Sequence, residues 1–299
     1  MRKVTPGPGS IEYAQSLTCL GEVEFGEEKL DEALANLRMA LDIYGAFDDK
    51  VAWESLRIQA LIGRIYYLKK NFNNAHRAIE ACLLRIDEQF SEESEMKSNL
   101  LLLRGKILAA QKNLAGAYDQ FKRCLSIRKR DGKEKRSVLE VLLEIACVLF
   151  EQEQHKHCIV YFQEALRIKK LLGETGTVAS IQNQLGMSYL NLGKFDEGMR
   201  TFQEIRFHHS NSFQNVDHRQ SELAHLAYNI GRAHVGLEEK DMGRASYLDA
   251  IDRYSLSHMH IGNGLLSKCS HDIPTFKKGV EDKQTATMHD QIAGIFGYS

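Results

Sequence analysis

Residues 185–202, LGMSYLNLGKFDEGMRTF, hold the pattern that decides the fold of this chain. Its fixed positions are a Leu-Gly pair, an aromatic residue, a small residue and a second aromatic residue, at Leu185-Gly186, Tyr189, Gly198 and Phe202. Apolar and small residues at intervals of three and four place one face of a helix against a neighbour. The polar turn Gly193-Lys194-Phe195 divides the stretch, so we expect two helices joined as a hairpin.

The same pattern occurs six times between residues 11 and 254. The first small residue of each copy lies at Gly21, Gly63, Gly105, Ala146, Gly186 and Gly231, and the second at Ala33, Ala75, Ala117, Cys158, Gly198 and Gly243. Successive copies are 42 (21 to 63), 42 (63 to 105), 41 (105 to 146), 40 (146 to 186) and 45 (186 to 231) residues apart. Small residues let the two helices of a hairpin approach closely, and hairpins that cannot bury their apolar faces alone stack into an array.

The composition agrees with an all-helical protein. Its three prolines, Pro6, Pro8 and Pro274, leave residues 9–273 free of the main helix breaker. The chain has 39 Lys and Arg against 40 Asp and Glu, and this net charge of −1 gives no general attraction to nucleic acid or to an anionic membrane. The six cysteines lack CxxC spacing and no segment reads as a signal peptide or membrane span. We therefore expect a cytoplasmic protein with reduced, buried thiols.

These residues resemble the tetratricopeptide repeat, in which a helix A packs against a helix B. The resemblance covers residues 11–254 and implies an all-α fold, an α-solenoid of about six repeats forming a right-handed superhelix. The repeats are expected at residues 14–47, 56–89, 98–131, 139–172, 179–212 and 224–254, with Gly45, Gly132 and Gly173 ending three of the B helices. Residues 1–10 are predicted to be a disordered tail, and residues 255–299 an irregular tail with a capping helix after Pro274.

The long period, near 42 residues, resembles the kinesin light chain and the spindle adaptors with Leu-Gly-Asn repeats, and similar arrays occur in ciliary proteins. That resemblance implies a non-enzymatic scaffold or adaptor, which binds a peptide or helical segment of another protein in the concave face lined by the A helices. Motor, spindle and ciliary assemblies are the expected settings, with association to the cytoskeleton or a cilium. A structural subunit of a large cytoskeletal or axonemal complex is the alternative. Neither function implies a cofactor, nucleic acid or membrane insertion.

Aligning the repeats gives the residues expected in the groove. Arg64 and Lys106 occupy the same position in adjacent repeats, and two cations in one register predict a site for an acidic segment. Repeats five and six supply carboxamides that could pair with the backbone of an extended peptide, at Asn183, Gln184 and Asn229. The register adds Tyr228 and Arg232 to this set, and Leu61, Leu103 and Leu143 as an apolar floor. A solvated helix face that is simply polar is the alternative interpretation of these positions.

We find no motif for catalysis or metal binding. Phosphate loops, GxSxG and HExxH are absent, and the histidine pairs His155/His157, His208/His209 and His258/His260 point in different directions on a helix. Residues 122–136, KRCLSIRKRDGKEKR, contain eight basic residues. Because cations near the end of a helix favourably oppose its dipole, we interpret this segment as a solvated helix end rather than a nucleic-acid site.

Overall fold

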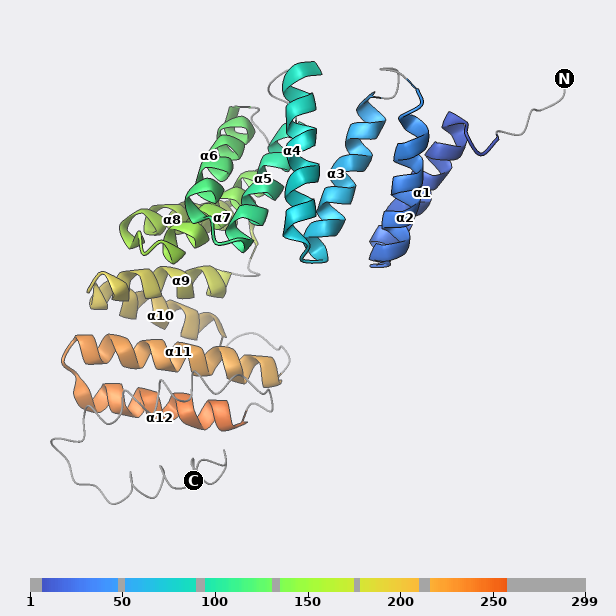
Figure 1. Cartoon of the computed structure of the whole chain (residues 1–299). Helices are drawn as coiled ribbons and strands as arrows, with labels where there is room; N and C mark the ends of the chain where they lie inside the picture. The colour runs from blue at the N-terminus through green and yellow to red at the C-terminus, as the bar shows by residue number, and fades with distance from the viewer. Residues whose placement is uncertain are drawn as a thin grey trace. The chain divides into compact units, whose positions relative to one another are not determined.

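The computed structural model describes residues 7–47, 52–89, 95–130, 135–174, 178–209 and 216–256. Within these ranges the chain forms twelve α-helices and no strand (Figure 1). The helices are α1 (Ile11–Gly26), α2 (Leu30–Tyr44), α3 (Ala52–Leu68), α4 (Phe72–Gln89), α5 (Glu95–Ala110), α6 (Leu114–Arg130), α7 (Lys135–Glu151), α8 (His155–Leu172), α9 (Val178–Asn191), α10 (Phe195–His209), α11 (Val216–Gly236) and α12 (Lys240–Leu256). The predicted all-α array of about six helical hairpins is confirmed.

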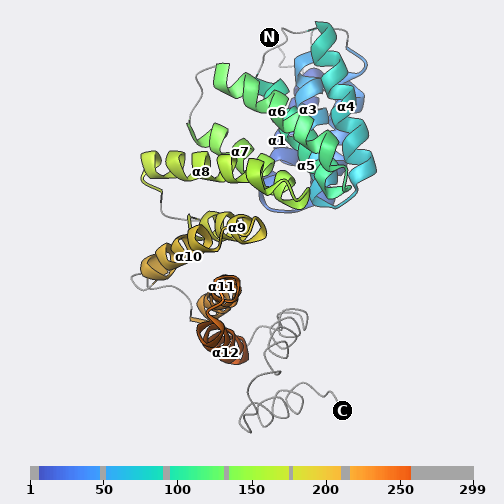
Figure 2. The ribbon, with the colours of Figure 1, turned by 90° about the vertical axis from the view of Figure 1, so that its left-hand side faces the viewer.

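The helices divide into two compact units. Residues Met1–Glu174 contain α1–α8, and residues Thr175–Ser299 contain α9–α12. Within each unit, every odd-numbered helix packs against the helix that follows it, and every even-numbered helix packs against the first helix of the next hairpin. Figure 2 shows this stacking of hairpins inside each unit. The odd-numbered helices are thus the A helices of the repeats and the even-numbered helices are the B helices.

The first small residue of each hairpin lies where helix A touches its own helix B. A Cβ atom on Gly186 would lie 2.4 Å from Cε1 of Phe202, and one on Gly105 would lie 2.3 Å from Cε1 of Phe121. The other glycines at this position make equivalent contacts, Gly21 with Leu37, Gly63 with Ile79 and Gly231 with Tyr247. No side chain longer than hydrogen fits these contacts without a shift, so the small residues set the helix spacing as the repeat pattern predicts.

The A–B turns share a backbone feature that the sequence pattern did not reveal. Seven residues after the first small residue, each hairpin has a residue with positive φ, at Glu28 (62°), Lys70 (57°), Lys112 (64°), Glu153 (58°), Gly193 (72°) and Glu238 (64°). The next residue donates its N–H to a carbonyl five residues back, as from Asn113 to Leu108 (2.9 Å), which closes a Schellman motif. Five of the six turns therefore hold a side chain in the left-handed region, which disfavours L-residues.

The ends of the array are described only in part. Residues 7–10 form a turn that ends at Ser10, whose Oγ accepts a hydrogen bond from the Tyr13 N–H (3.2 Å) and caps α1. Residues 1–6, Gly132 and the predicted capping helix after Pro274 lie outside the described residues. Gly45 and Gly173 do follow α2 and α8, and Gly173 takes the left-handed conformation (φ 66°).

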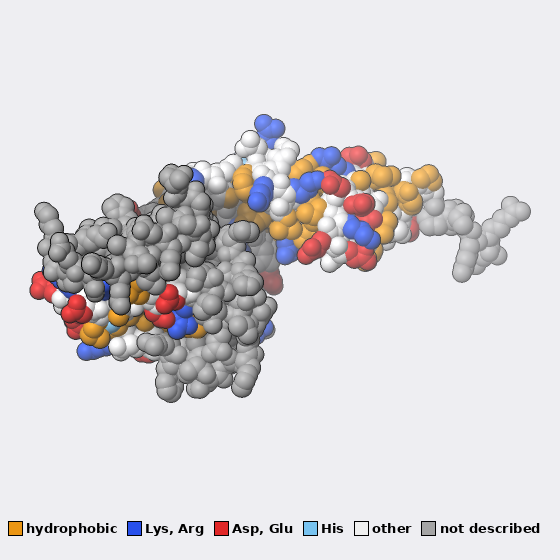
Figure 3. All heavy atoms as spheres, turned by 90° about the horizontal axis from the view of Figure 1, so that it is seen from below, with side chains coloured by type: hydrophobic (Ala, Val, Ile, Leu, Met, Phe, Trp, Pro, Cys, Tyr) orange, Lys and Arg blue, Asp and Glu red, His pale blue; other side chains and the backbone are white. Residues whose placement is uncertain are grey.

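The surface carries both signs of charge. In the view of Figure 3, acidic, basic and hydrophobic side chains are intermixed on the described surface of the N-terminal unit. No helix in the described ranges is long and apolar enough to cross a membrane.

Candidate partner-binding groove

A groove of about 890 Å³ lies on the N-terminal unit. It is lined mainly by the A helices α3 and α5, with one residue each from α6 and α7. The apolar lining is Trp53, Ala60, Leu61, Tyr67, Leu68, Met96, Leu100, Leu102 and Leu103. The polar lining is Arg57, Arg64, Glu95, Asn99, Lys106, Arg128 and Glu140. A hollow of this size and mixed lining can hold several side chains of a bound segment.

Helix α3 presents its groove residues on one face. Trp53, Arg57, Leu61, Arg64 and Leu68 follow one another at intervals of three or four residues. The adjacent face of α3 is buried in the core through Ile58, Ile62 and Ile65. Trp53 and Leu68 are 44% and 49% exposed, so α3 offers uncovered apolar surface before and after Arg64.

Ion pairs join neighbouring A helices from one repeat to the next in a fixed register, which we call the charge ladder. The ladder joins two positions of neighbouring repeats. The first is the residue directly after the first small residue of one repeat, and the second is the residue six places before the first small residue of the following repeat. Glu22 (21 + 1) meets Arg57 (63 − 6), with Oε1 and Nη2 3.2 Å apart. Lys106 (105 + 1) meets Glu140 (146 − 6), with Nζ and Oε1 2.9 Å apart. In the repeat between these pairs, the same two positions are occupied by Arg64 (63 + 1) and by an amide residue, Asn99 (105 − 6).

Arg64 is exposed, and its guanidinium lies 5.2 Å from the centroid of the Phe25 ring. That distance is typical of a cation–π contact, which leaves the donors at the edge of the guanidinium open to solvent. No carboxylate in the described ranges forms an ion pair with Arg64. Its ladder counterpart Asn99 instead accepts a hydrogen bond from Nη2 of Arg128 (2.9 Å).

Lys106 has carboxylate partners that Arg64 lacks, although the two residues occupy the same position in adjacent repeats. Burial opposes its charge, but the carboxylates of Glu140 (2.9 Å) and Glu144 (3.3 Å) outweigh that effect and raise the pKa of Lys106. Burial likewise opposes the charge of Glu140, yet its hydrogen bonds from Lys106 and Arg128 lower its pKa. The structure thus brings both predicted cations into one groove, and of these two only Arg64 is without a described carboxylate partner.

The carboxamides predicted on the C-terminal unit lie close together. Asn229, which is 4% exposed, donates from Nδ2 to Oδ1 of Asn183 (3.0 Å) and so links repeats five and six. Gln184 is half-buried on α9. Asn183 also lines a pocket of about 160 Å³ together with Ala179, Ser180, Ile205, Glu222, His225 and Leu226.

The two remaining predicted residues are engaged within the same unit. Tyr228 packs against Tyr247, with ring centroids 5.6 Å apart, and so contributes to the core of the last hairpin. Arg232 donates from Nη2 to Oδ1 of Asn191 on α9 (3.2 Å).

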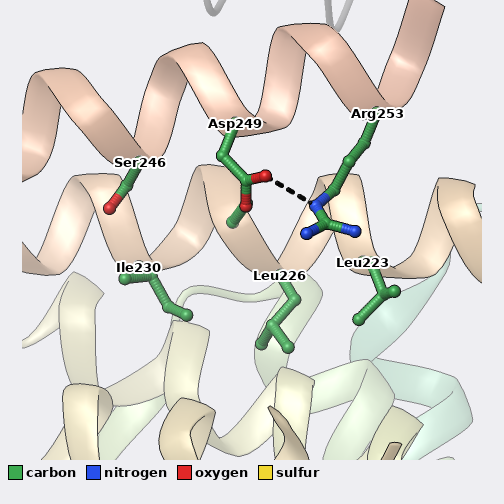
Figure 4. A pocket seen from close by; sticks show the side chains of 7 residues that line it. Leu223, Leu226, Ile230, Ser246, Asp249 and Arg253 are labelled. Atoms are coloured by element: carbon green, nitrogen blue, oxygen red, sulfur yellow. Dashed lines mark hydrogen bonds and ion pairs between the residues drawn. The ribbon is translucent and has the colours of Figure 1, made fainter. Parts of the chain in front are cut away.

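A small cavity lies between α11 and α12 (Figure 4). Leu223, Leu226 and Ile230 line it from α11, and the ion pair of Asp249 with Arg253 (2.9 Å) lines it from α12. Its volume of about 40 Å³ has room for at most a few water molecules. We therefore do not assign it to partner binding.

Sequence reasoning named Leu61, Arg64, Leu103 and Lys106 and missed the rest of the groove lining, including Trp53, Arg57 and Arg128. Trp53 and Arg57 precede Arg64 by eleven and seven residues, so extending the α3 face backwards by three turns would have found both. Arg128 belongs to a B helix, and nothing in the repeat register marks it as a groove residue.

The cysteines and histidines give no reactive site in the described part of the chain. No group of three His, Cys, Asp or Glu side chains there could hold a metal ion. Burial raises the pKa of Cys82 to about 12 and that of Cys124 to about 11, so both thiols stay protonated at neutral pH. The prediction of buried thiols was right for these two and for Cys158. It was wrong for Cys19 and Cys147, which are exposed because their positions on the A helices turn away from the core.

Comparisons with known proteins agree with this architecture. The family model described as tetratricopeptide repeat matches residues 179–205. No curated protein matches the sequence. Among solved structures, BtubC (BKLC) from P. vanneervenii is similar with a TM-score of 0.60 and 16% identity over 78% of this chain and 94% of its own. The apo form of RapI has a TM-score of 0.60 and 14% identity over 81% and 98%. A putative kinesin light chain from Podosopora anserina with nearly identical TPR-like repeats has a TM-score of 0.57 and 12% identity over 68% and 96%. At these identities the likeness concerns the fold.

Proposed function

Because the chain has the fold of a tetratricopeptide repeat array, we propose that it is a non-enzymatic scaffold that binds a segment of a partner protein in the groove of α3 and α5. The observation that carries the proposal is Arg64, an exposed cation with no described carboxylate partner, inside a groove of about 890 Å³ with a mixed apolar and polar lining. The chemistry fits a segment with one acidic residue for Arg64 and apolar residues for Trp53 and Leu68.

Electrostatics favour Arg64 over Lys106 as the residue that binds the carboxylate. A charge-assisted hydrogen bond is worth about 1.5–3 kcal/mol when the donor is available. Lys106 already has two carboxylates, so an incoming acid would have to displace one or share the cation. We therefore propose that Lys106 shapes the groove through Glu140 and Glu144, while Arg64 binds the ligand.

The amide residues of the C-terminal unit form a second part of the proposal. Asn183, Gln184 and Asn229 would bind backbone groups of the partner, with Tyr228 and Arg232 beside them. For that, Asn183 and Asn229 must exchange their mutual hydrogen bond for bonds to the peptide, at little net cost if each new bond replaces an old one.

The cellular setting is also a proposal. The fold likeness to a putative kinesin light chain supports a motor or other cytoskeletal assembly in the cytoplasm. Spindle and ciliary assemblies use arrays of similar period and are tested by the same experiment.

The experiment begins with affinity capture of partners by the full chain, followed by titration with acidic peptides from the captured proteins. Trp53 is the only tryptophan in the sequence and lines the groove, so its fluorescence reports binding there directly. Arg64→Glu should weaken binding about tenfold or more, as expected for loss of a charge-assisted contact. Asn99→Glu should also weaken it, because it gives Arg64 the ladder carboxylate that the neighbouring repeats have.

Lys70→Glu is the matched control, since it makes the same change of charge at an exposed turn outside the groove. If all three variants bind a peptide equally well, the groove is not its site. If every partner persists in the Arg64→Glu and Asn99→Glu variants and arrives as one stoichiometric assembly, the chain is a structural subunit instead.

A further inference from the structure

The outer face of the N-terminal unit is strongly basic at the B helices α6 and α8. Their exposed cations are Lys122, Arg123, Lys129, Arg130, Lys156, Arg167 and Lys170, which we call the outer basic face. The first B helix of the same unit, α2, differs: its exposed charges are Asp31, Glu32 and Asp42 against Arg38. Because the whole chain has a net charge of −1, the excess of cations on α6 and α8 is a local feature.

Side-chain contacts join the two helices into one surface. The side chains of Tyr118 on α6 and Tyr161 on α8 interact, which raises the pKa of Tyr161 after the larger effect of its burial, and Lys122 lies 5.5 Å from the centroid of the Tyr118 ring. The pKa of Glu164 on α8 is lowered first by its hydrogen bond with Arg167 and further by the charge of Lys129 on α6. Lys122 thus lies beside Tyr118, and Lys129 of α6 acts on Glu164 of α8.

The spacing of the cations suits an extended segment. Lys122 and Lys129 are seven residues apart on α6, which corresponds to about 10 Å along the helix axis. An extended chain rises about 3.3 Å per residue, so carboxylates three residues apart match this distance. Arg128 and Cys124, between them in sequence, are buried and take no part in the outer face.

We propose that the outer basic face binds an acidic segment of a protein, at a site separate from the groove. Two observations favour a protein over nucleic acid or an anionic membrane. Asp119 and Glu164 interrupt the cations, so the positive charge lies at separate points and not in the continuous row that suits a run of phosphates. Val160 and Leu171 on α8 are 62% and 55% exposed, and they offer apolar contacts that a protein segment with aliphatic residues can use.

The test uses the full chain and a fluorescent peptide of four Glu-Glu-Leu triplets, with binding measured by anisotropy at about 50 mM salt, where charges are weakly screened. Lys122→Glu with Lys129→Glu should raise the Kd by about tenfold or more, since two attractions become repulsions. Lys70→Glu with Lys112→Glu is the matched control and should change the Kd less than about twofold. Glutamate can adopt the backbone conformation of both control sites, because Glu28 and Glu153 have it in equivalent turns. The ion pair of Lys112 with Glu151 that the control removes is solvent-exposed and contributes little to stability.

The arms of the experiment separate this face from the groove. Arg64→Glu should leave binding of the triplet peptide unchanged if the outer basic face is its site. The proposal is overturned if Arg64→Glu abolishes binding and the Lys122/Lys129 variant does not, or if both charge-reversal pairs weaken binding equally. It is also overturned if the wild-type chain does not bind the peptide. Tighter binding of duplex DNA or phosphatidylserine vesicles, compared at the same concentration of negative charge, would likewise overturn it. Circular dichroism of each variant confirms that the helices are intact.

Discussion

Replacing Gly186 with alanine adds one methyl group at the contact between α9 and α10. The new Cβ would lie 2.4 Å from Cε1, 2.6 Å from Cζ and 3.0 Å from Cδ1 of Phe202. Ordinary contacts between carbon atoms are about 3.5–4.0 Å, so the ring must move by about 1 Å. Phe202 is fully buried in a core with Leu190, Met199 and Ile205, and it cannot rotate out without opening that core.

Two opposing terms set the size of the effect. Overpacking a well-filled core costs about 1–3 kcal/mol, and three ring atoms in close contact place this site in the upper part of that range. Alanine is favoured over glycine inside a helix by about 1 kcal/mol, which offsets part of the cost. We therefore expect Gly186→Ala to destabilise the hairpin by about 1–2 kcal/mol.

Gly26→Ala is the matched control. Gly26 is the last residue of α1, and a Cβ there would meet no atom within 4 Å. Only the propensity term remains, so this variant should be neutral or more stable by about 0.5 kcal/mol.

Hydrogen exchange followed by mass spectrometry suits the measurement, because arrays of repeats often unfold in parts and one global midpoint can hide a local change. Amides of α9 and α10 should exchange faster in Gly186→Ala, while those of α3 and α4 act as an internal reference. If Gly186→Ala and Gly26→Ala have the same sign of effect, the helix register derived from the small residues is wrong.

Three further predictions follow from the turns, the groove charges and the buried cation. Glu153→Gly relieves a left-handed side chain and should stabilise the protein by about 0.5–1 kcal/mol, whereas Gly193→Glu should cost a similar amount; thermal melts of both variants check this pair. Because the pKa of Glu140 is lowered below its ordinary 4.5, its stabilising effect is complete above pH 4.5 and is lost as the pH falls through the folded-state pKa. Urea unfolding between pH 3 and 7 should therefore show a smaller loss at acid pH in Glu140→Gln than in the wild type. Arg128 is 4% exposed, donates to Asn99 and pairs with Glu140, so Arg128→Met removes charge-assisted hydrogen bonds and should cost about 1.5–3 kcal/mol by urea denaturation.

The fold was predictable because close helix packing demands small residues at fixed positions. Gly186 and Phe202 contact each other within one hairpin, and a small residue paired with a large one in this way recurs at the same positions of each repeat in the sequence. The left-handed turn residues were not predictable in the same way. Five of the six are Lys or Glu, which have no particular preference for that conformation, so only the folded backbone reveals them.

The candidate groove was predictable in position but not in electrostatic state. Register placed Arg64 and Lys106 on the same face, and both line the groove. Their difference depends on carboxylates from the next repeat, which a single aligned column of residues does not contain. The same holds for Asn183 and Asn229, because their mutual hydrogen bond joins two different columns of the alignment.

The charge ladder allows charge contacts between neighbouring repeats to be predicted from the sequence. The pairs Glu22 with Arg57 and Lys106 with Glu140 have opposite polarity, yet they occupy the same two positions of the repeat. A ladder of this kind neutralises groove charges wherever both positions are charged, and such paired groups gain little from a ligand that must displace a partner. Of the three ladder positions in the N-terminal unit, only the one at Arg64 has an amide in place of a carboxylate. On the proposed function, the ligand's carboxylate completes the ladder there, so Asn99 determines the preference of the groove for an acidic partner as much as Arg64 does.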